Sequence, residues 1–461
     1  MTSPEVSAPD GVSRHGDLAG TPSALDDALT TDALDTIELD AVLAIVAGHA
    51  AGELAAARLR ARRPTGELPW IRRELARVGE IAALFRRGDA LAAEPVPDIA
   101  RALARARIDG SVLDGLELAR VRRVLAAART VRDDLVRVRE LAPLAAELLA
   151  DLPPRPIERR LEQSLDDDGN VLDSASPALA AARKEVHAAR QRLVRRLESV
   201  LRSIEPAGGS DAAVTVRGGR YVIPVRRDLR HRPGGIIHDE SSSQGTLFIE
   251  PSEAVEYGNA LREAEVAEER ETLRVLRELT ELLRPELPAV RAVFEMCLRV
   301  DELVARARYA TGSAGEVPEL APAPGPLHIV DGRHPLLLGG ESAVIPFDLT
   351  LDEGERTLLV SGPNTGGKTV LLKAVALFAA MAQCGIVPPV GPGTRLPVFS
   401  RFAADIGDRQ SIAASLSTFS AHVRTLGAIL AEADDASLVL LDEVGSGTDP
   451  AEGAALAAAA L

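Results

Sequence analysis

Apolar residues recur at spacings of three and four from Ile37 to about Leu165, as in "LDAVLAIVAGHAAGELAAARL". This period is typical of amphipathic helices. Prolines interrupt the stretch several times, so we predict several helices packed as a bundle. Residues 1–36 are rich in Ser, Thr, Pro, Gly, Asp and Ala, and this composition predicts a disordered tail.

Two long helices are predicted next. Ser176 followed by Pro177 is a helix-start signal, because serine caps a helix and proline fits its first turn. Apolar residues then repeat every seven positions, so the helix should pack along one seam against a partner. These residues are Leu179, Val186, Leu193 and Val200. The candidate partner is the run from about Ser252 to Leu283.

The segment between the two helices alternates apolar and polar residues around Gly-Gly breaks. "AVTVRGGRYVIPVRRDL" and "GGIIHDESSSQGTLFIEP" are typical of strands and hairpins. We therefore predict two long helices that carry a small β-rich tip at about residues 206–252. Leu247, Phe248 and Ile249 lie in this tip, and we expect Phe248 to be a core strand residue.

The last third of the chain changes pattern again. A third helical stretch runs to about Tyr309, and the Gly/Ala/Pro-rich segment 312–326 is predicted to be a linker. From Leu327 strand and helix patterns alternate, which predicts an α/β domain. The sequence ends at "GAALAAAAL", inside a helical pattern without a cap, so we expect this domain to be incomplete.

Composition narrows the class of protein. The net charge of −15 argues against a generally basic nucleic-acid-binding surface, although a local basic patch remains compatible with it. Two cysteines give neither a disulfide framework nor a metal-binding spacing. The sequence shows no signal peptide and no apolar run of membrane-spanning length. We therefore expect a cytoplasmic protein without a membrane partner.

The segment "TLLVSGPNTGGKTVLLKAVAL" is predicted to form a strand, a glycine loop and a helix start. Its spacing matches G-x-x-x-x-G-K-[ST], in which backbone N–H groups and the helix N-terminus bind phosphate. Lys368 would reach the β- and γ-phosphates of ATP, and Thr369 would hold Mg²⁺. The expected nucleotide-binding residues are Gly362, Pro363, Asn364, Thr365, Gly366, Gly367, Lys368 and Thr369.

"SLVLLDEVGSGTD" is an apolar strand that ends in two acids. Such acids are common on surfaces, but these follow Lys368 by about 74 residues, as in phosphoryl-transfer sites. Asp442 would hold the Mg²⁺, and Glu443 would orient and deprotonate the attacking water.

The loop "GPNTGGKT", the segment "LSTFSAHV" and "LLDEVGSGTDPAEG" together resemble the MutS family of mismatch-repair-type ATPases. "DGRHPLL" is similar to that family's entry to the ATPase. "DSASPAL", "RGGRYVIPV" and "HDESSSQGTLFIEP" resemble its bacterial type-2 branch. The resemblance covers about residues 37–461. It implies a helical core at 37–175, lever helices with a clamp at 176–311, a linker at 312–326 and an ABC-type P-loop ATPase domain at 327–461.

The resemblance also implies activities and partners. A homodimer would share each ATP site, with Ser417 contacting the γ-phosphate bound by the partner subunit; the alternative is an ordinary helix cap. The type-2 branch implies binding of branched or mismatched DNA and suppression of recombination, or splitting of stalled, collided ribosomes through rRNA contacts. Its endonuclease activity belongs to a C-terminal part beyond this sequence. Phe248-Ile249-Glu250 resembles a mismatch wedge, but its place in the tip argues against that role.

The predicted tip carries a second candidate site. Between Val214 and Ile237 there are six arginines and one acid, Asp228. The arginines are Arg217, Arg220, Arg226, Arg227, Arg230 and Arg232. Arginine suits phosphate contacts, although charge on strand edges also guards against aggregation. Strand alternation places Arg220, Arg226 and Arg230 on one parity.

Three functions remain open. The chain is a DNA-handling ATPase, a ribosome-splitting ATPase, or a nucleotide-gated DNA clamp or scaffold without nuclease activity. Glu443 argues against a scaffold without turnover, because a site that does not hydrolyse ATP needs no base.

Overall fold

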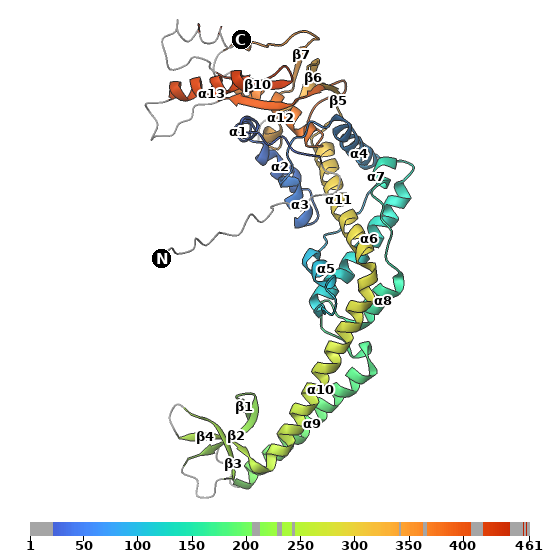
Figure 1. Cartoon of the computed structure of the whole chain (residues 1–461), viewed down its shortest axis with the longest axis vertical. Coiled ribbons are helices and arrows are strands. Elements are labelled where there is room, and N and C mark those ends of the chain that lie inside the picture. Colours follow the sequence, from blue (N-terminus) through green and yellow to red (C-terminus); the bar gives the residue numbers. More distant parts are fainter. Residues whose placement is uncertain are drawn as a thin grey trace, which may run out of the picture. The chain divides into compact units, whose positions relative to one another are not determined.

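The chain is described by a computed structural model (Figure 1), which covers residues 22–204, 213–227, 233–241, 245–340, 343–362, 367–406 and 418–442, with 455 and 458. These residues pack as two units. Unit 1 contains Met1–Val96, Thr130–Leu149 and Glu295–Leu461, and unit 2 contains Pro97–Arg129 and Ala150–Phe294. No helix in the described part of the chain is long and apolar enough to cross a membrane.

Unit 2 is built on two long helices and a small sheet. Its helices are α5 (Ala100–Ala106), α8 (Arg155–Ser164), η1 (Asp173–Ala175), α9 (Pro177–Ile204), α10 (Ser252–Leu283) and η2 (Arg284–Glu286). Helices α6 (Gly115–Val138) and α11 (Leu287–Gly312) give residues to both units. The bounds of α10 are those predicted from the sequence.

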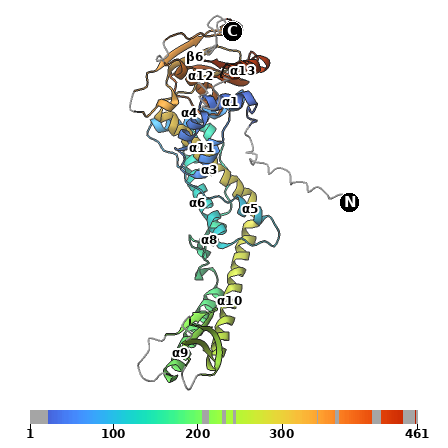
Figure 2. The ribbon, with the colours of Figure 1, turned by 90° about the vertical axis from the view of Figure 1, so that its left-hand side faces the viewer.

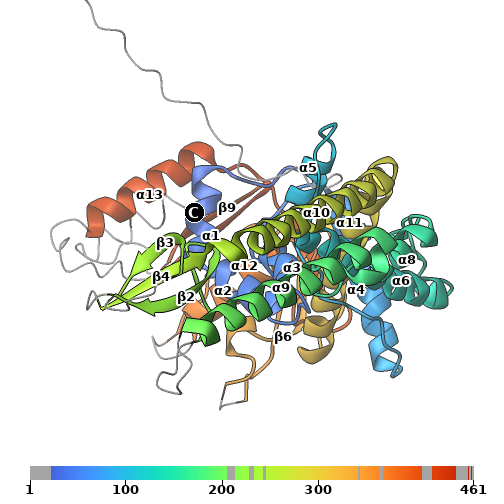
Figure 3. The same cartoon turned by 90° about the horizontal axis from the view of Figure 1, so that it is seen from below.

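The seam between α9 and α10 follows the predicted seven-residue repeat. Leu179, Val186, Leu193 and Val200 are all buried on α9. The Oγ of Ser176 accepts hydrogen bonds from the backbone N–H groups of Ala178 and Leu179, at 3.2 and 3.4 Å. Figure 3 shows the two helices side by side. Both the start of α9 and its partner are therefore confirmed.

The sheet of unit 2 lies where α9 ends and α10 begins, as Figures 1 and 2 agree. Its strands are β1 (Thr215–Arg217), β2 (Arg220–Arg226), β3 (Gly235–Glu240) and β4 (Thr246–Pro251). They are antiparallel, in the order β1-β2-β4-β3. Ile223, Val225, Leu247 and Ile249 share one core with the buried face of α9. The predicted strands and hairpins are confirmed.

Phe248 does not occupy the core position that we predicted for it. It is half-buried and does not belong to the core that contains its neighbours Leu247 and Ile249. Successive strand residues point to opposite faces, so only one parity of β4 can enter that core. The expectation that Phe248 is a core residue is therefore wrong.

Unit 1 combines helices with two sheets. Its helices are α1 (Ala28–Thr36), α2 (Leu39–Ala47), α3 (Glu53–Arg60), α4 (Leu68–Arg86), α7 (Pro143–Ala146), η3 (Pro335–Leu337), α12 (Lys368–Gln383) and α13 (Thr418–Glu432). Its strands are β5 (Glu319–Pro322), β6 (Leu327–Gly332), β7 (Phe347–Leu351), β8 (Arg395–Val398), β9 (Arg401–Asp405) and β10 (Ser437–Leu441).

The end of the expected disordered tail is helical, which corrects the prediction for residues 28–36; residues 1–21 lie outside the described part. Asp27 caps α1, because its Oδ1 accepts a 3.0 Å hydrogen bond from the N–H of Thr30. Ala33 and Leu34 are buried. The Oγ1 of Thr30 also accepts a 3.2 Å hydrogen bond from the N–H of Phe402. This contact with β9 is too distant in sequence for local composition to reveal.

The segment 312–326 also differs from its prediction. We expected a linker, but it contains β5, which pairs in parallel with β8. The sheet order is β5-β8-β6-β7, and a second sheet consists of the parallel strands β9 and β10. The Gly/Ala/Pro-rich composition concealed this strand, because its hydrogen-bonding partner lies more than 70 residues later.

The segment before the glycine loop differs from its prediction as well. We expected a strand at "TLLV", but residues 355–361 form neither helix nor strand. Leu358 and Leu359 are 46% and 79% exposed. A strand is defined by pairing with a neighbour, and no described strand pairs with these residues.

Candidate functional site

The first turn of α12 forms one side of the site. Gly367 precedes the helix in a left-handed conformation, with φ 77° and ψ 19°, which glycine adopts without steric cost. Glycine supplies no side-chain cap to the first-turn N–H groups, and such a helix terminus suits an anion. The helix is held firmly, because all ten residues from 374 to 383 are buried. The predicted start of this helix is confirmed.

Lys368 is the first residue of α12. Its Nζ donates a 2.7 Å hydrogen bond to the carbonyl oxygen of Gly362, at the beginning of the glycine loop. The ammonium group therefore lies beside the loop that its motif assigns to phosphate.

Thr369 and Asp442 are brought together from two elements. The Oγ1 of Thr369 donates a 2.5 Å hydrogen bond to Oδ2 of Asp442, across 73 residues of sequence. Asp442 directly follows β10. A hydroxyl and a carboxylate oxygen are hard oxygen ligands of the kind Mg²⁺ prefers. The described residues therefore include two adjacent oxygens that fit the expected ion.

Asp405 and His422 adjoin these residues and were not singled out by sequence reasoning. The N–H of Asp442 donates a 2.9 Å hydrogen bond to the carbonyl oxygen of Asp405. The carboxylate of Asp405 lies 2.9 and 2.8 Å from Nδ1 of His422, through its Oδ1 and Oδ2. No motif links an aspartate at a strand end with a histidine 17 positions later, so the sequence carried no signal for the pair.

Several expected site residues lie outside the described part of the chain. In the nucleotide site these are Pro363, Asn364, Thr365, Gly366, Ser417 and Glu443, and in the tip Arg230 and Arg232. Gly362, Gly367, Lys368, Thr369 and Asp442 are described. Among them, Lys368 contacts Gly362 and Thr369 contacts Asp442.

The arginines of the small sheet are accompanied by more acids than the sequence window suggested. Arg217 lies 3.3 Å from Asp239, and Arg227 lies 2.6 Å from Glu240. Both acids belong to β3, just beyond the window that contained one acid. Sheet pairing brings them back against the arginines, so the local excess of positive charge is smaller than expected.

Arg220 is held by a buried carboxylate. Its Nη1 lies 3.4 Å from Oε1 of Glu250 and 3.3 Å from Oδ1 of Asn259. Glu250 is 3% exposed, and its Oε2 also lies 2.7 Å from Nε2 of His238. Strand β2 ends at Arg226, so strand alternation no longer fixes the face on which Arg230 lies.

Phe248 and Glu250 do not have the exposure that a mismatch wedge requires. The guanidinium carbon of Arg217 lies 4.6 Å from the centre of the Phe248 ring, a cation–π contact. Glu250 is buried between its two partners. These contacts support the view that Phe248-Ile249-Glu250 is structural.

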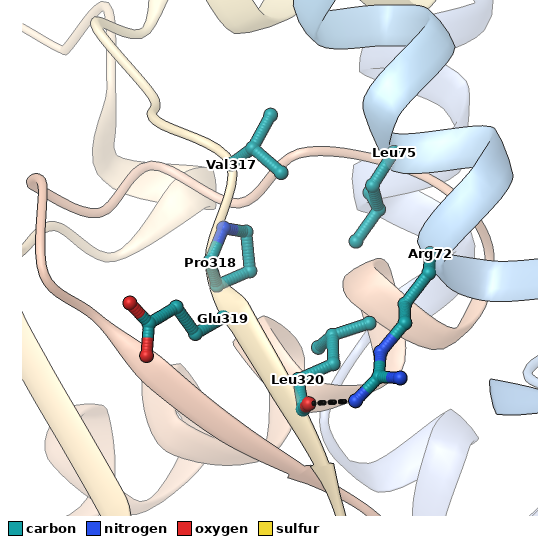
Figure 4. Close-up of a pocket in the computed structure, with 6 residues that line it drawn as sticks. All are labelled: Arg72, Leu75, Val317, Pro318, Glu319 and Leu320. Carbon is teal, nitrogen blue, oxygen red and sulfur yellow. Dashed lines mark hydrogen bonds between the residues drawn. The ribbon is translucent and has the colours of Figure 1, made fainter. Parts of the chain in front are cut away.

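A pocket of about 390 Å³ lies between α4 and β5 (Figure 4). Its lining residues are Arg72, Leu75, Val317, Pro318, Glu319 and Leu320. Arg72 Nη2 donates a 2.7 Å hydrogen bond to the carbonyl oxygen of Leu320, and Glu319 pairs with Arg395 at 2.8 Å. Both charged side chains are thus engaged by other groups of the protein. Because a ligand site needs polar groups that converge on its cavity, we assign no ligand to this pocket.

Comparisons with known proteins agree with the motifs. Residues 358–461 match the family model MutS domain V. The chain is 47% identical over 441 residues to a protein of Gemmatimonas aurantiaca named endonuclease MutS2, covering 94% of this chain and 54% of that protein. It is 41% identical to the Geobacillus thermodenitrificans protein of that name, covering 93% and 55%. Over 94% of its length the chain is similar to a protein of the MutS2 branch of the MutS family.

A third relative extends the comparison. The Thermomicrobium roseum protein named endonuclease MutS2 is 39% identical over 449 residues, covering 94% of this chain and 56% of that protein. The chain thus spans about half the length of the curated relatives it matches. The resemblance stated from the sequence motifs is confirmed.

Proposed function

We propose that this chain binds and hydrolyses ATP with Mg²⁺, as an ABC-type P-loop ATPase whose domain includes residues 327–461. The observation that carries the proposal is the hydrogen bond between Thr369 and Asp442, beside Lys368 at the N-terminus of α12. Phosphoryl transfer needs a cation, a metal-holding hydroxyl and a metal-holding carboxylate at one point, and these residue types meet here.

Each residue has a distinct role in the proposal. Lys368 neutralises charge on the β- and γ-phosphates, while the loop N–H groups and the α12 N-terminus hold phosphate oxygens. Thr369 and Asp442 hold Mg²⁺, which neutralises the charge that develops on the transferring phosphate. Glu443 orients the attacking water and accepts its proton.

The test compares two lysines of one helix. Lys368→Ala should abolish ATP binding, because it removes the phosphate partner at the loop. Lys373→Ala is the matched control, since its Nζ pairs with Glu38 at 2.8 Å, and it should bind ATP normally. Nucleotide affinity measured by calorimetry decides between them. Equal weakening in both variants would contradict the assignment of Lys368.

Turnover requires a separate variant. Glu443→Gln should retain ATP binding but stop hydrolysis, because the amide cannot accept the proton. Phosphate release is the measurement. If Glu443→Gln hydrolyses ATP at the parent rate, Glu443 is not the base. A parent protein that binds ATP without releasing phosphate would instead support the interpretation as a nucleotide-gated scaffold.

We propose further that two copies form a homodimer, with Ser417 of each acting at the ATP site of the other.

We favour branched DNA as the macromolecular ligand, bound at the arginines of the small sheet. Arginine contacts suit any phosphate polymer, so ribosomal RNA in stalled ribosomes is the outcome to distinguish. Co-sedimentation of the complete protein with four-way DNA junctions and with ribosomes, with and without ATP, separates the two ligands.

We also propose the domain organisation that the sequence resemblance implies. A helical core at 37–175 and lever helices at 176–311 with their clamp would precede the ATPase domain. Any endonuclease activity would belong to a part of the protein beyond these residues. The proposed location is the cytoplasm.

A further inference from the structure

The Asp405–His422 pair joins the end of a strand to the beginning of a helix. Asp405 is the last residue of β9 and is buried, at 9% exposure. His422 lies one turn into α13, four residues after Thr418. Both carboxylate oxygens lie within 2.9 Å of Nδ1. An ionised carboxylate can only accept, so Nδ1–H is the donor and its proton is shared between two acceptors.

The pair is not needed to hold Asp442. The backbone carbonyl of Asp405 accepts the N–H of Asp442, and Leu441 pairs with Asp405 in the parallel β9–β10 ladder. These are main-chain contacts that persist when the side chain of His422 is removed. The imidazole therefore acts on its own element, α13.

The later turns of α13 have apolar anchors. Leu426 and Ile429 are both buried at 4% exposure. His422 precedes them and supplies a charged hydrogen bond nearer the beginning of the helix. Charge-assisted hydrogen bonds are shorter and stronger than neutral ones. The pair can thus fix how the first turns of α13 lie against the strand end that adjoins Asp442.

We propose that His422 and Asp405 are positioning residues for ATP hydrolysis: they hold the beginning of α13, the helix that follows Ser417 in sequence, in the position that the partner's ATP site requires. This inference rests on the proposed function, because Ser417 immediately precedes α13 in sequence. Displacing a catalytic group by about 1 Å can cost roughly 100-fold in rate. His422 touches no substrate in this scheme and acts only through α13.

Steady-state kinetics of the complete protein give the first readout. His422→Ala should lower kcat roughly 10- to 100-fold while leaving KM for ATP within about twofold, because Lys368 and the loop of the same subunit bind the nucleotide. His422→Asn should restore most of the rate, since its amide N–H can donate in place of Nδ1.

His328→Ala is the matched control. It removes another histidine–aspartate contact of unit 1, between His328 Nε2 and Asp352 Oδ1 at 3.3 Å, and should leave both constants unchanged. A His422→Ala variant with parental kcat would overturn the inference. So would a reduced kcat that His422→Asn fails to restore.

Mixed dimers give the second readout. In a Ser417→Ala/Lys368→Ala dimer, one composite site keeps both its loop and its serine, so part of the activity should return. A His422→Ala/Lys368→Ala dimer should recover equally, because its intact loop faces an intact α13. A wild-type subunit paired with a His422→Ala, Lys368→Ala double variant should stay inactive.

The outcomes separate the two proposals. If the serine mixture recovers and the histidine mixture does not, His422 acts within its own subunit's ATP site and the inference is overturned alone. If the serine mixture fails in a demonstrated heterodimer, the shared site and the inference fail together. Recovery of the histidine mixture also shows that His422→Ala folds.

Discussion

Glu74 is a buried carboxylate surrounded by guanidinium groups. It lies 2.9 Å from Arg306 and 2.6 Å from Arg77, and Arg62 lies 3.9 Å away. Burial alone would raise the pKa of Glu74, but Arg306, Arg62 and Arg77 outweigh burial and lower that pKa to about 2. Burial, with Arg62, lowers the pKa of Arg306 to about 10, so Arg306 stays charged at neutral pH.

These shifts predict a specific decrease of stability in acid. A carboxyl with a depressed pKa stabilises the folded state above its unfolded pKa, here 4.5, and that contribution disappears as pH falls towards about 2. By linkage this amounts to roughly 3 kcal/mol. Glu74→Gln should therefore flatten the pH dependence of the unfolding free energy in this window, as measured by urea titration.

At neutral pH the same variant should be less stable by about 3 kcal/mol or more, because it leaves the buried Arg306 without its nearest charge partner. Glu316→Gln is the control, since its pair with Arg86 at 3.1 Å is exposed and should change stability by less than about 1 kcal/mol. An unchanged pH slope in Glu74→Gln would contradict the role given to this carboxyl.

Single residues also show what the sequence could reveal. Lys368, Thr369 and Asp442 were predicted because fixed spacing within short motifs identifies them. Asp405 and His422 were not, because their contact depends on how α13 returns to β9. The acids Asp239 and Glu240 were missed as partners of arginines for the same reason, since sheet pairing decides which charges meet.

At the scale of elements, α12 connects the candidate site to the buried ion pairs. Its first turn carries Lys368 and Thr369. At its C-terminal end, Arg62 donates to the carbonyl of Cys384 at 2.9 Å and Arg306 donates to the carbonyl of Gly385 at 2.8 Å. Cations favour the C-terminal end of a helix. Helix α12 is therefore fixed at both ends by polar contacts and along its length by burial.

Elements with a local pattern were predicted well, and elements defined by distant partners were not. The seven-residue repeat indicated α9 and its seam, and the capping serine indicated its beginning. Strand β5 and helix α1 were missed, because β8 and β9 complete them from far along the chain. The expected strand before the glycine loop was wrong, because an apolar run alone does not supply a pairing partner.

The small sheet carries the prediction for macromolecular binding. Arg226 and Arg227 lie at the end of β2, and Arg226 is exposed. Replacing both by Ala should weaken binding of DNA junctions or ribosomes. It should also reduce the slope of log K against log salt by about one for each phosphate that the protein no longer neutralises. Titration of binding across a salt series is the measurement.

Two further variants make that test specific. Arg192→Ala is the control, because it removes an exposed arginine of α9 that pairs with Glu185 at 2.6 Å. Arg220→Ala should instead lower stability, since it leaves the buried Glu250 with one fewer partner. Parental affinity and slope in the Arg226, Arg227 variant would mean that these arginines only protect a strand edge.

At the scale of the whole molecule, two hydrophobic cores among the described residues share no residue with each other. One core joins residues of α1, α2, α11 and α12 with Phe402 and Leu440, all in unit 1. The other joins α9, α10 and the small sheet, all in unit 2. Two cores unfold in one cooperative step only when their contacts stabilise one another. We therefore expect these two cores to unfold separately.

Scanning calorimetry should therefore record more than one heat-absorption peak, and no single melting temperature will describe this chain. ATP with Mg²⁺ should move only the peak of unit 1 upward, by mass action on the state that binds it. Leu377→Ala should lower that peak, and Leu193→Ala should lower the other, because each empties a fully or almost fully buried position in one core. One peak that responds to both substitutions would show that the two cores melt as one.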